Sequence, residues 1–157
     1  MKNLGKLSVS ILVCELVGIL SMPFTIASIP TWYAGLIKPP FSPPNWLFGP
    51  VWIILYFLMG IAVYLVWKKR LKNKKVKIAL KYFLIQLFLN FIWSPLFFGF
   101  HQPLIALYDI VLLLIMIVLT MKQFHSISKP AFYLLIPYLL WVSFATLRNL
   151  SIVILNR

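Results

Sequence analysis

The chain has 157 residues, a length that suits a single domain. Hydrophobic residues make up 62% of it and charged residues only 11%, whereas a soluble domain is about half apolar and about a quarter charged. This composition excludes an ordinary soluble protein. The formal net charge of +13 would indicate nucleic-acid binding in a soluble chain, but here the basic residues lie between hydrophobic segments, so no nucleic acid is expected as a partner.

Five apolar segments are each long enough to cross a bilayer, which takes about 20 helical residues. They are predicted at 7–29, 46–67, 82–100, 104–121 and 131–155. The sequence therefore predicts an all-α fold, a single domain over 1–157 that forms an integral membrane bundle of five transmembrane helices. Pro23 is expected to kink the first helix, and Pro137 to leave the carbonyl of Tyr133 without its helical donor. Taken alone, the first segment also resembles a cleaved signal peptide, although its apolar core is longer than such peptides have.

Residues 30–45, between the first two spans, form a connection that is rich in proline and aromatic residues. Prolines such as Pro39, Pro40 and Pro43 fix φ and remove backbone donors, so this segment cannot be an ordinary helix and should be stiff. Large aromatic side chains on a stiff backbone lose little entropy when they close over a ligand. We therefore predict that this segment covers a binding site, and we call it the lid loop.

A dense basic loop is predicted at 68–81, between the second and third spans. With the amino terminus inside, all of the 15 lysine and arginine residues except Lys38, Arg148 and Arg157 fall on the inner side. The positive-inside rule therefore predicts an inner amino terminus. The segment Lys68–Lys81 should also attract anionic lipid headgroups by about 1 kcal/mol per residue; the other interpretation is that it is a topology signal only.

Three of the predicted spans carry aromatic and polar residues on one helical face, because residues three or four apart are neighbours on a helix. These residues are Trp52 and Tyr56 in the second span, Asn90, Trp93 and Phe97 in the third, and Trp141, Phe144, Ala145 and Arg148 in the fifth. Such walls would hold a flat hydrophobic ligand by stacking, while the polar groups orient its edges. The alternative is that the aromatic residues only fill the bundle core or lie at the membrane interfaces.

Three residues that are charged at neutral pH fall inside the spans, where charges are functional candidates by default. Glu15 would serve a proton-coupled exporter or, as a hydrogen-bonded acid, hold helices together. Asp109 lies on the lid side of the fourth span and is expected to line the pocket or to be structural. Arg148 either extends to the outer interface or pairs with a ligand propionate.

No catalytic residues and no metal site are expected. Cys14 cannot form an internal disulfide, and His101 and His125 fall in turns on opposite sides without an adjacent nucleophile. The alternative for His101 is axial ligation of a haem iron.

Motifs at fixed spacing add a family resemblance that covers most of the chain. They are Trp32-Tyr33-Ala34-Gly35-Leu36, Lys38-Pro39, Pro43-Pro44, Trp46, Gly49-Pro50-Val51-Trp52, Leu55-Tyr56, Met59-Gly60, Tyr64-Leu65-Val66-Trp67, Asn90, Trp93, Pro95, Phe97-Phe98-Gly99, Asp109, Pro137-Tyr138-Leu139, Trp141, Phe144 and Asn149. Through these residues the chain closely resembles the tryptophan-rich sensory protein/translocator protein (TspO/MBR) family, the peripheral-type benzodiazepine receptors, and it looks like a bacterial member.

The resemblance implies five helices around a pocket that opens toward the first loop. It implies porphyrins, sterol-like molecules or synthetic benzodiazepine-site ligands as the compounds bound. The expected ligand-binding residues are Trp32, Tyr33, Trp52, Tyr56, Asn90, Trp93, Phe97, Asp109, Trp141, Phe144 and Ala145. The sterol motif of animal members needs a Tyr where Leu150 stands here, so tetrapyrroles are the expected ligands. No cofactor is required, and a homodimer is expected because the family often forms one.

The expected function is that of a membrane receptor or sensor that binds protoporphyrin IX and haem-like tetrapyrroles. One alternative is a transporter of tetrapyrroles or other hydrophobic ligands, although five spans cannot form two equal inverted repeats unless a dimer supplies the symmetry. Another is a light-dependent porphyrin-degrading enzyme, since an excited porphyrin beside Trp52 and Trp141 would meet easily oxidised indoles.

Overall fold

In the computed structural model, the described residues, 2–69 and 72–157, form helices and loops without a strand. The helices are α1 (Lys2–Ser28), α2 (Phe48–Trp67), α3 (Lys74–Ser94) with the π-helical turn η3 (Pro95–Gly99), α4 (Pro103–Ile127), α5 (Lys129–Leu134) and α6 (Ile136–Leu155). They supply five segments long and apolar enough to cross a membrane, the last formed by α5 and α6 together. The predicted all-helical membrane fold with five spans is confirmed.

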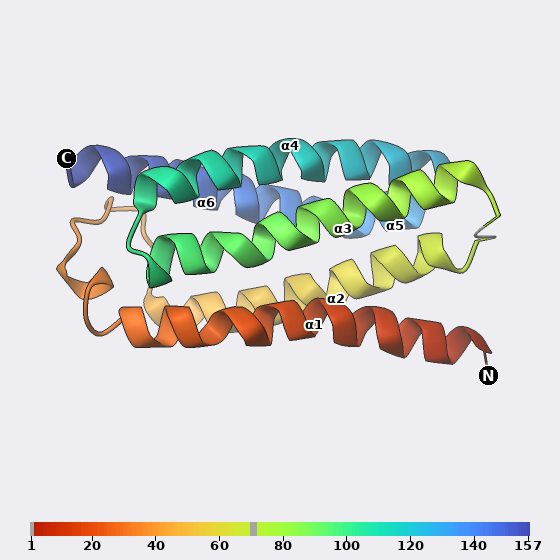
Figure 1. Ribbon diagram of the computed structural model, residues 1–157, viewed down its shortest axis with the longest axis horizontal. Helices are drawn as coiled ribbons and strands as arrows, with labels where there is room; N and C mark the ends of the chain where they lie inside the picture. Colours follow the sequence, from red (N-terminus) through yellow and green to blue (C-terminus); the bar gives the residue numbers. More distant parts are fainter. Residues whose placement is uncertain (1, 70–71) are drawn as a thin grey trace.

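The helices run side by side along the long axis of the molecule (Figure 1). Around the bundle, α1 packs against α2 and α3, α3 against α4, and α4 against both α5 and α6, while α2 closes the ring mainly against α5. The lid loop lies at one end, beside the carboxyl terminus; it contains the short turn η1 (Tyr33–Gly35), and a second turn, η2 (Asn45–Leu47), joins its last residue to α2. The amino terminus lies at the other end.

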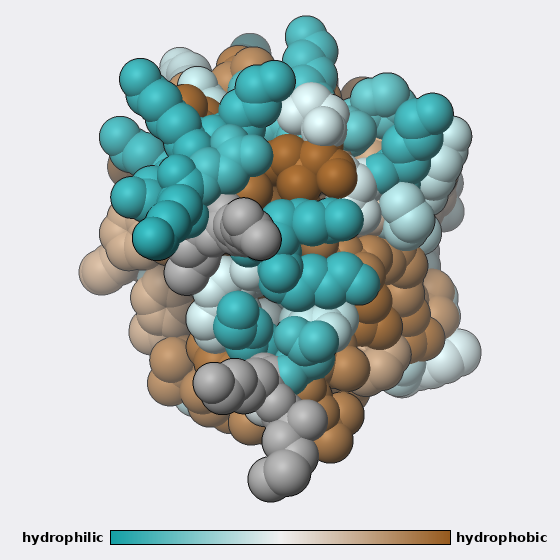
Figure 2. Space-filling view, turned by 90° about the vertical axis from the view of Figure 1, so that its right-hand side faces the viewer, coloured by the Kyte–Doolittle hydropathy of each residue, from teal (hydrophilic) through white to brown (hydrophobic). Residues whose placement is uncertain are grey.

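Hydrophilic side chains gather at the end opposite the lid loop (Figure 2). The connection between α2 and α3, the last turns of α4 and the start of α5 all reach this end, and they carry the lysines that the sequence assigned to the inner side. Arg70 of the predicted basic loop lies outside the described residues. This separation of charge agrees with the positive-inside rule, and which end lies inside the cell stays a prediction.

The third helix begins earlier than the sequence indicated. It starts at Lys74 and not at residue 82, so more than half of the predicted basic loop 68–81 is helical. Asn73 caps the helix, because its side-chain oxygen accepts a hydrogen bond from the backbone N–H of Lys75 at 2.9 Å. The first turns also bury Val76, Ala79 and Phe83, whose spacing places them on one face.

The fourth helix extends beyond its predicted end at residue 121 and finishes at Ile127. The polar residues that suggested a turn occupy only the outer face of this last part. On the inner face Phe124 is fully buried and its ring stacks on that of Phe83, with centroids 5.8 Å apart. Burial of this aromatic pair favours continuing the helix.

The fifth span, predicted as one helix over 131–155, is divided at Leu135 into α5 and α6. The backbone N–H of Leu135 donates to the carbonyl of Phe132 at 3.1 Å, which tightens the last turn of α5. Pro137 then falls in the first turn of α6, where its missing N–H cannot bond the carbonyl of Tyr133. The proline therefore produces a break and a restart.

Close contact between α1 and α2 depends on glycine. A Cβ at Gly60 would lie 2.6 Å from the Cα atom of Ile11, and a Cβ at Gly18 would lie 2.6 Å from the ring of Tyr56. Only glycine permits this approach, and small residues serve the same purpose in many membrane helix pairs.

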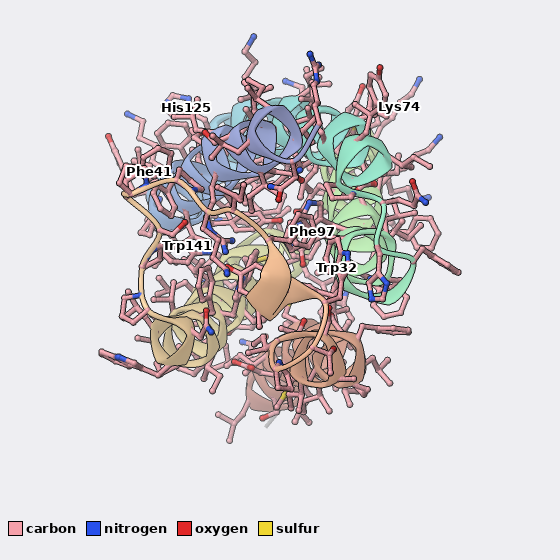
Figure 3. All side chains as sticks on the ribbon, turned by 90° about the vertical axis from the view of Figure 1, so that its left-hand side faces the viewer. Trp32, Phe41, Lys74, Phe97, His125 and Trp141 are labelled. Atoms are coloured by element: carbon pink, nitrogen blue, oxygen red, sulfur yellow. The ribbon has the colours of Figure 1, made fainter. Side chains whose placement is uncertain are left out.

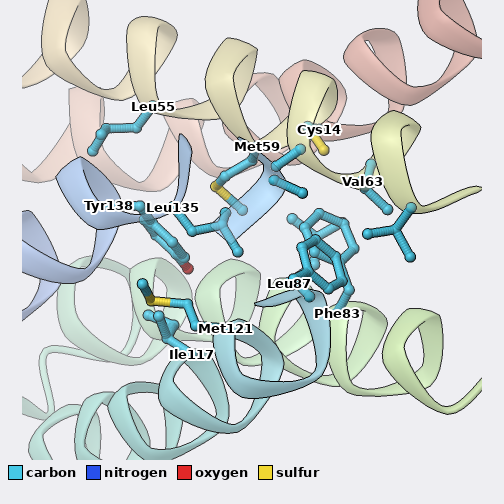
Figure 4. Packing of buried hydrophobic residues seen from close by; sticks show 14 of the residues in the cluster. Cys14, Leu55, Met59, Val63, Phe83, Leu87, Ile117, Met121, Leu135 and Tyr138 are labelled. Atoms are coloured by element: carbon cyan, nitrogen blue, oxygen red, sulfur yellow. The ribbon is translucent and has the colours of Figure 1, made fainter. Parts of the chain in front are cut away.

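Apolar side chains fill the centre of the bundle, where Met59, Leu135 and Tyr138 lie together (Figure 4). The outer face of α1 is also apolar: Leu12, Leu16, Ile19 and Leu20 are all exposed. Such a large exposed apolar surface is unfavourable in water and is typical of a surface that contacts lipid. Packed side chains fill most of the bundle interior and leave little space for a ligand there. The candidate site therefore lies nearer the lid loop.

Candidate functional site

The carboxyl end of α6 holds the lid loop in place through Asn156. The side-chain nitrogen of Asn156 donates to the carbonyl of Ile37, and its side-chain oxygen accepts from the N–H of the same residue, both at 2.9 Å. Next in the loop, the Lys38 ammonium lies 4.7 Å from the ring centroid of Tyr33 and donates to the carbonyl of Leu36 at 3.2 Å. These contacts close the loop over the ends of the helices.

Replacing Asn156 with alanine is expected to loosen the lid loop without unfolding the bundle. Of the three side-chain hydrogen bonds that are lost, one goes to Ile152 in α6 and two go to Ile37 in the loop. The two loop bonds contribute about 1 kcal/mol each, so amide exchange in the loop should accelerate on the order of ten- to thirtyfold. Hydrogen–deuterium exchange with mass spectrometry measures this, with Asn45→Ala, an exposed position in η2, as the matched control. Unchanged exchange in Asn156→Ala would mean that aromatic contacts alone hold the loop.

Beneath the lid loop, five aromatic rings form what we call the α3 aromatic cluster. It comprises Trp32 and Tyr33 of the loop with Trp93, Phe97 and Phe98 of α3 and η3. The ring of Trp93 stacks on that of Phe97 with centroids 5.0 Å apart, and Trp32 meets Phe97 edge-on at 5.7 Å. Tyr33 and Phe97 are almost fully buried. The rings therefore pack against one another as a small hydrophobic core beneath the loop. All of them except Phe98 were predicted as ligand-binding residues.

A second group of rings, the α6 aromatic cluster, consists of Phe41, Phe48, Trp141 and Phe144. Phe41 of the loop meets Phe144 edge-on at 6.1 Å, and Phe48 at the start of α2 meets Trp141 at 5.9 Å. Viewed from the lid end, Phe41 and Trp141 lie on one side of the loop, while Trp32 and Phe97 lie on the other (Figure 3). The aromatic residues predicted on the third and fifth spans therefore belong to two separate clusters.

Next to the α6 aromatic cluster, a groove of about 460 Å³ runs between α2 and α6. It is lined by Val51, Ile54, Leu55, Pro137, Leu140, Trp141 and Phe144. Ile54 and Leu140 are 59% and 64% exposed, so the groove opens sideways, toward the lipid that surrounds the bundle. Ligand sites usually measure about 300–1,000 Å³ and have mostly apolar walls, and this groove meets both conditions.

Deeper in the bundle, four polar side chains form a continuous hydrogen-bonded network. The hydroxyl of Tyr56 donates to Asn90 Oδ1, Asn90 Nδ2 donates to the hydroxyl of Tyr138 at 3.0 Å, and that hydroxyl donates to Gln86 Oε1 at 2.8 Å. All four residues are buried. Both ends of the Asn90 amide, predicted to orient a ligand, are thus bonded within the protein.

Arg148 lies between the two aromatic clusters. Its guanidinium carbon is 4.8 Å from the ring centroid of Phe48 and 5.4 Å from that of Tyr33. Its Nε atom donates to the hydroxyl of Ser42 in the lid loop at 3.4 Å. Only 4% of the residue is exposed, so the side chain lies under the loop and does not extend to the outer surface.

The remaining candidates occupy separate positions. Trp52 stacks on Tyr56 at 5.4 Å, and Ala145 is half-buried between Trp141 and Arg148 on the same face of α6. Asp109 is buried on α4, and its Oδ2 atom has no hydrogen-bond partner within the described part of the chain. Glu15 lies half-buried on α1 and belongs to neither aromatic cluster.

Sequence reasoning missed three residues of this region that a helical spacing would have indicated. Phe48 precedes Trp52 by four positions, Tyr138 precedes Trp141 by three and Gln86 precedes Asn90 by four, so each shares a face with a predicted residue. Asn156 offered no such signal, because its contact with Ile37 joins segments far apart in the chain.

Comparison with known proteins gives concordant matches. The model of the TspO/MBR family matches residues 10–155. The tryptophan-rich protein TspO of Archaeoglobus fulgidus is 48% identical over 155 residues, which cover 98% of this chain and 99% of the relative. The translocator protein of Bos taurus is 41% identical over 84% of this chain and 79% of its own, and the tryptophan-rich sensory protein of Cereibacter sphaeroides is 34% identical over 80% and 77%.

Proposed function

Because the chain belongs to the TspO/MBR family, we propose that it is a membrane receptor or sensor that binds porphyrins, such as protoporphyrin IX and haem-like tetrapyrroles. Synthetic benzodiazepine-site ligands would occupy the same place. The names of the relatives, a translocator protein and a sensory protein, fit a membrane receptor or sensor family.

One observation carries the choice of ligand: the α2–α6 groove leads directly into the α6 aromatic cluster. Trp141 and Phe144 belong to both, so an apolar wall continues into a group of edge-on and tilted rings beneath the lid loop. A flat, hydrophobic molecule would enter from the lipid, stack on Trp141 and be covered by the loop. A tetrapyrrole macrocycle has this shape and character.

Three further expectations belong to the same proposal. We propose that the lysines of Lys68–Lys81 contact anionic lipid headgroups, since several are exposed at the hydrophilic end of the bundle. We also propose a homodimer and a bacterial plasma membrane location. The dimer interface would have to lie elsewhere than at Gly18 and Gly60, because these two glycines already permit the close contact between α1 and α2.

The proposal is tested by titrating the protein in lipid nanodiscs with protoporphyrin IX in the dark. The porphyrin absorption band is the readout, because substitutions of tryptophan alter the protein's own fluorescence. Wild type should saturate at micromolar ligand, and Trp141→Ala should bind about tenfold more weakly, which corresponds to about 1.4 kcal/mol. Removing one stacking ring has an effect of about that size.

The matched control is Trp46→Ala, because Trp46 is 72% exposed and lies outside the groove and both clusters. It should bind as wild type does. Uptake that rises without saturation and is equal in all three proteins would show that the porphyrin only dissolves in the lipid, and the proposal would then be wrong.

A further inference from the structure

Arg148 is a buried cation that has no counterion in the part of the chain that the structure describes. Its Nη2 atom is buried and has no hydrogen-bond partner among the residues that the structure describes. The sequence has only two acidic residues, Glu15 and Asp109. Of these, the buried Asp109 also has an oxygen, Oδ2, without a hydrogen-bond partner among the described residues, so Asp109 and Arg148 do not satisfy each other. A buried charge without a partner is unfavourable, and one that is retained inside a membrane span is a functional candidate.

The groups around Arg148 hold its guanidinium in place but leave part of its hydrogen-bonding capacity unused. The rings of Tyr33 and Phe48 contact its guanidinium, and Ser42 Oγ accepts from Nε, which fixes the side chain and leaves Nη2 without an acceptor. The hydroxyl of Tyr33 is also buried and also lacks a partner in the described part of the chain. Two donors, Arg148 Nη2 and the hydroxyl of the adjacent Tyr33, are therefore unsatisfied, and the Lys38 ammonium on the Tyr33 ring adds a second positive charge.

The same cluster lies along the path of the proposed ligand. Trp141, Ala145 and Arg148 follow one another at helical spacing on α6, so the wall of the α2–α6 groove leads toward the guanidinium. Phe48 contacts both ends of this path, because its ring lies 5.9 Å from that of Trp141 and 4.8 Å from the Arg148 guanidinium carbon. A molecule stacked on Trp141 would present its edge to Arg148.

We propose that Arg148, together with the hydroxyl of Tyr33, binds a carboxylate of the ligand, so that the site selects flat hydrophobic molecules that carry an acidic side arm. This inference rests on the proposed function and specifies the ligand class of that site. The carboxylate supplies the acceptor that Nη2 lacks, and a charge-assisted hydrogen bond under the loop is stronger than one in water. Among tetrapyrroles, those with free propionate groups are preferred to their neutral esters.

The test compares protoporphyrin IX with its dimethyl ester, in the dark, in nanodiscs of zwitterionic lipid that offer no competing anionic headgroup. Wild type is expected to bind the acid on the order of tenfold more tightly than the ester. Arg148→Gln should lose most of this preference by binding the acid more weakly while the ester is unaffected. Arg148→Lys should keep part of it, and Tyr33→Phe should reduce it. Arg157→Gln, a charge change at the exposed carboxyl terminus, is the matched control and should match wild type.

Ester binding also reports whether each variant is folded, because the ester needs the groove but not the guanidinium. Equal binding of acid and ester by wild type would overturn the assignment of Arg148 and leave the proposed function standing. An equal loss of both compounds in Arg148→Gln would also overturn it, because Arg148 would then only support the structure. Saturable binding of neither compound by wild type would overturn the proposed function, and this inference with it.

Discussion

Replacing Gly60 with alanine is expected to destabilise the protein, although alanine normally favours a helix. The added Cβ would lie 2.6 Å from the Cα and 3.0 Å from the backbone nitrogen of Ile11, and backbone atoms cannot rotate away. Separating α1 from α2 costs about 1–3 kcal/mol, whereas the gain in helix propensity is at most about 1 kcal/mol. The overpacking cost should dominate, so the midpoint of thermal unfolding in detergent should fall.

The matched control for this experiment is Gly49→Ala in the same helix. No described atom lies within 4 Å of the position that a Cβ at Gly49 would occupy. This variant should be neutral or slightly more stable than wild type, so only Gly60→Ala should lower the unfolding midpoint. Similar shifts at both positions would contradict the close contact between Gly60 and Ile11.

Replacing Asn90 with leucine is expected to have the largest effect among changes to the polar network. The substitution removes the hydrogen bonds to Tyr56 and Tyr138 together and leaves the hydroxyl of Tyr56 buried without its acceptor. An unsatisfied buried group costs about 1–3 kcal/mol. Polar contacts between membrane helices average nearer 0.6 kcal/mol, so we expect a loss of about 1–3 kcal/mol in all for the two bonds. Thermal unfolding or titration with a denaturing detergent measures it.

A double substitution separates the hydrogen bond from simple packing. Tyr56→Phe removes the donor, so Asn90→Leu should cost less in the Tyr56→Phe background than in wild type. Tyr133→Phe, which removes the hydroxyl of a residue that is 60% exposed, serves as the control and should change stability little. Strict additivity of Tyr56→Phe and Asn90→Leu would show that the Tyr56–Asn90 hydrogen bond contributes nothing to the fold.

The network also bears on where a ligand finds polar partners. Asn90 already bonds Tyr56 through Oδ1 and Tyr138 through Nδ2, so a ligand would find only the second lone pair or the second N–H of the amide. The Nη2 atom of Arg148, in contrast, has no hydrogen-bond partner among the described residues. The guanidinium under the lid loop is therefore the polar group that is most available to a ligand.

The sequence by itself determined the features that depend on local composition. Hydrophobic length indicated five spans, and the prolines of 30–45 indicated a non-helical connection that covers one end of the bundle. Helical spacing placed Trp141 and Phe144 on the face that lines the groove. Boundaries were less secure: α3 starts at Lys74 because of the Asn73 cap, and α4 continues to bury Phe124, although polar residues in both segments suggested loops.

The tertiary structure decided which faces meet, and a pattern along one helix cannot show this. Asn90 and Tyr138 lie on different helices, and only their packing turns two predicted walls into a closed hydrogen-bonded network. Arg148 reads in sequence as a charge near a helix end, yet the lid loop folds over it and brings Tyr33 and Ser42 against its guanidinium. The physical reason is that burial and hydrogen-bond satisfaction depend on neighbours from distant segments of the chain. Hydropathy and proline, in contrast, affect the local backbone and can be interpreted from the sequence of one segment.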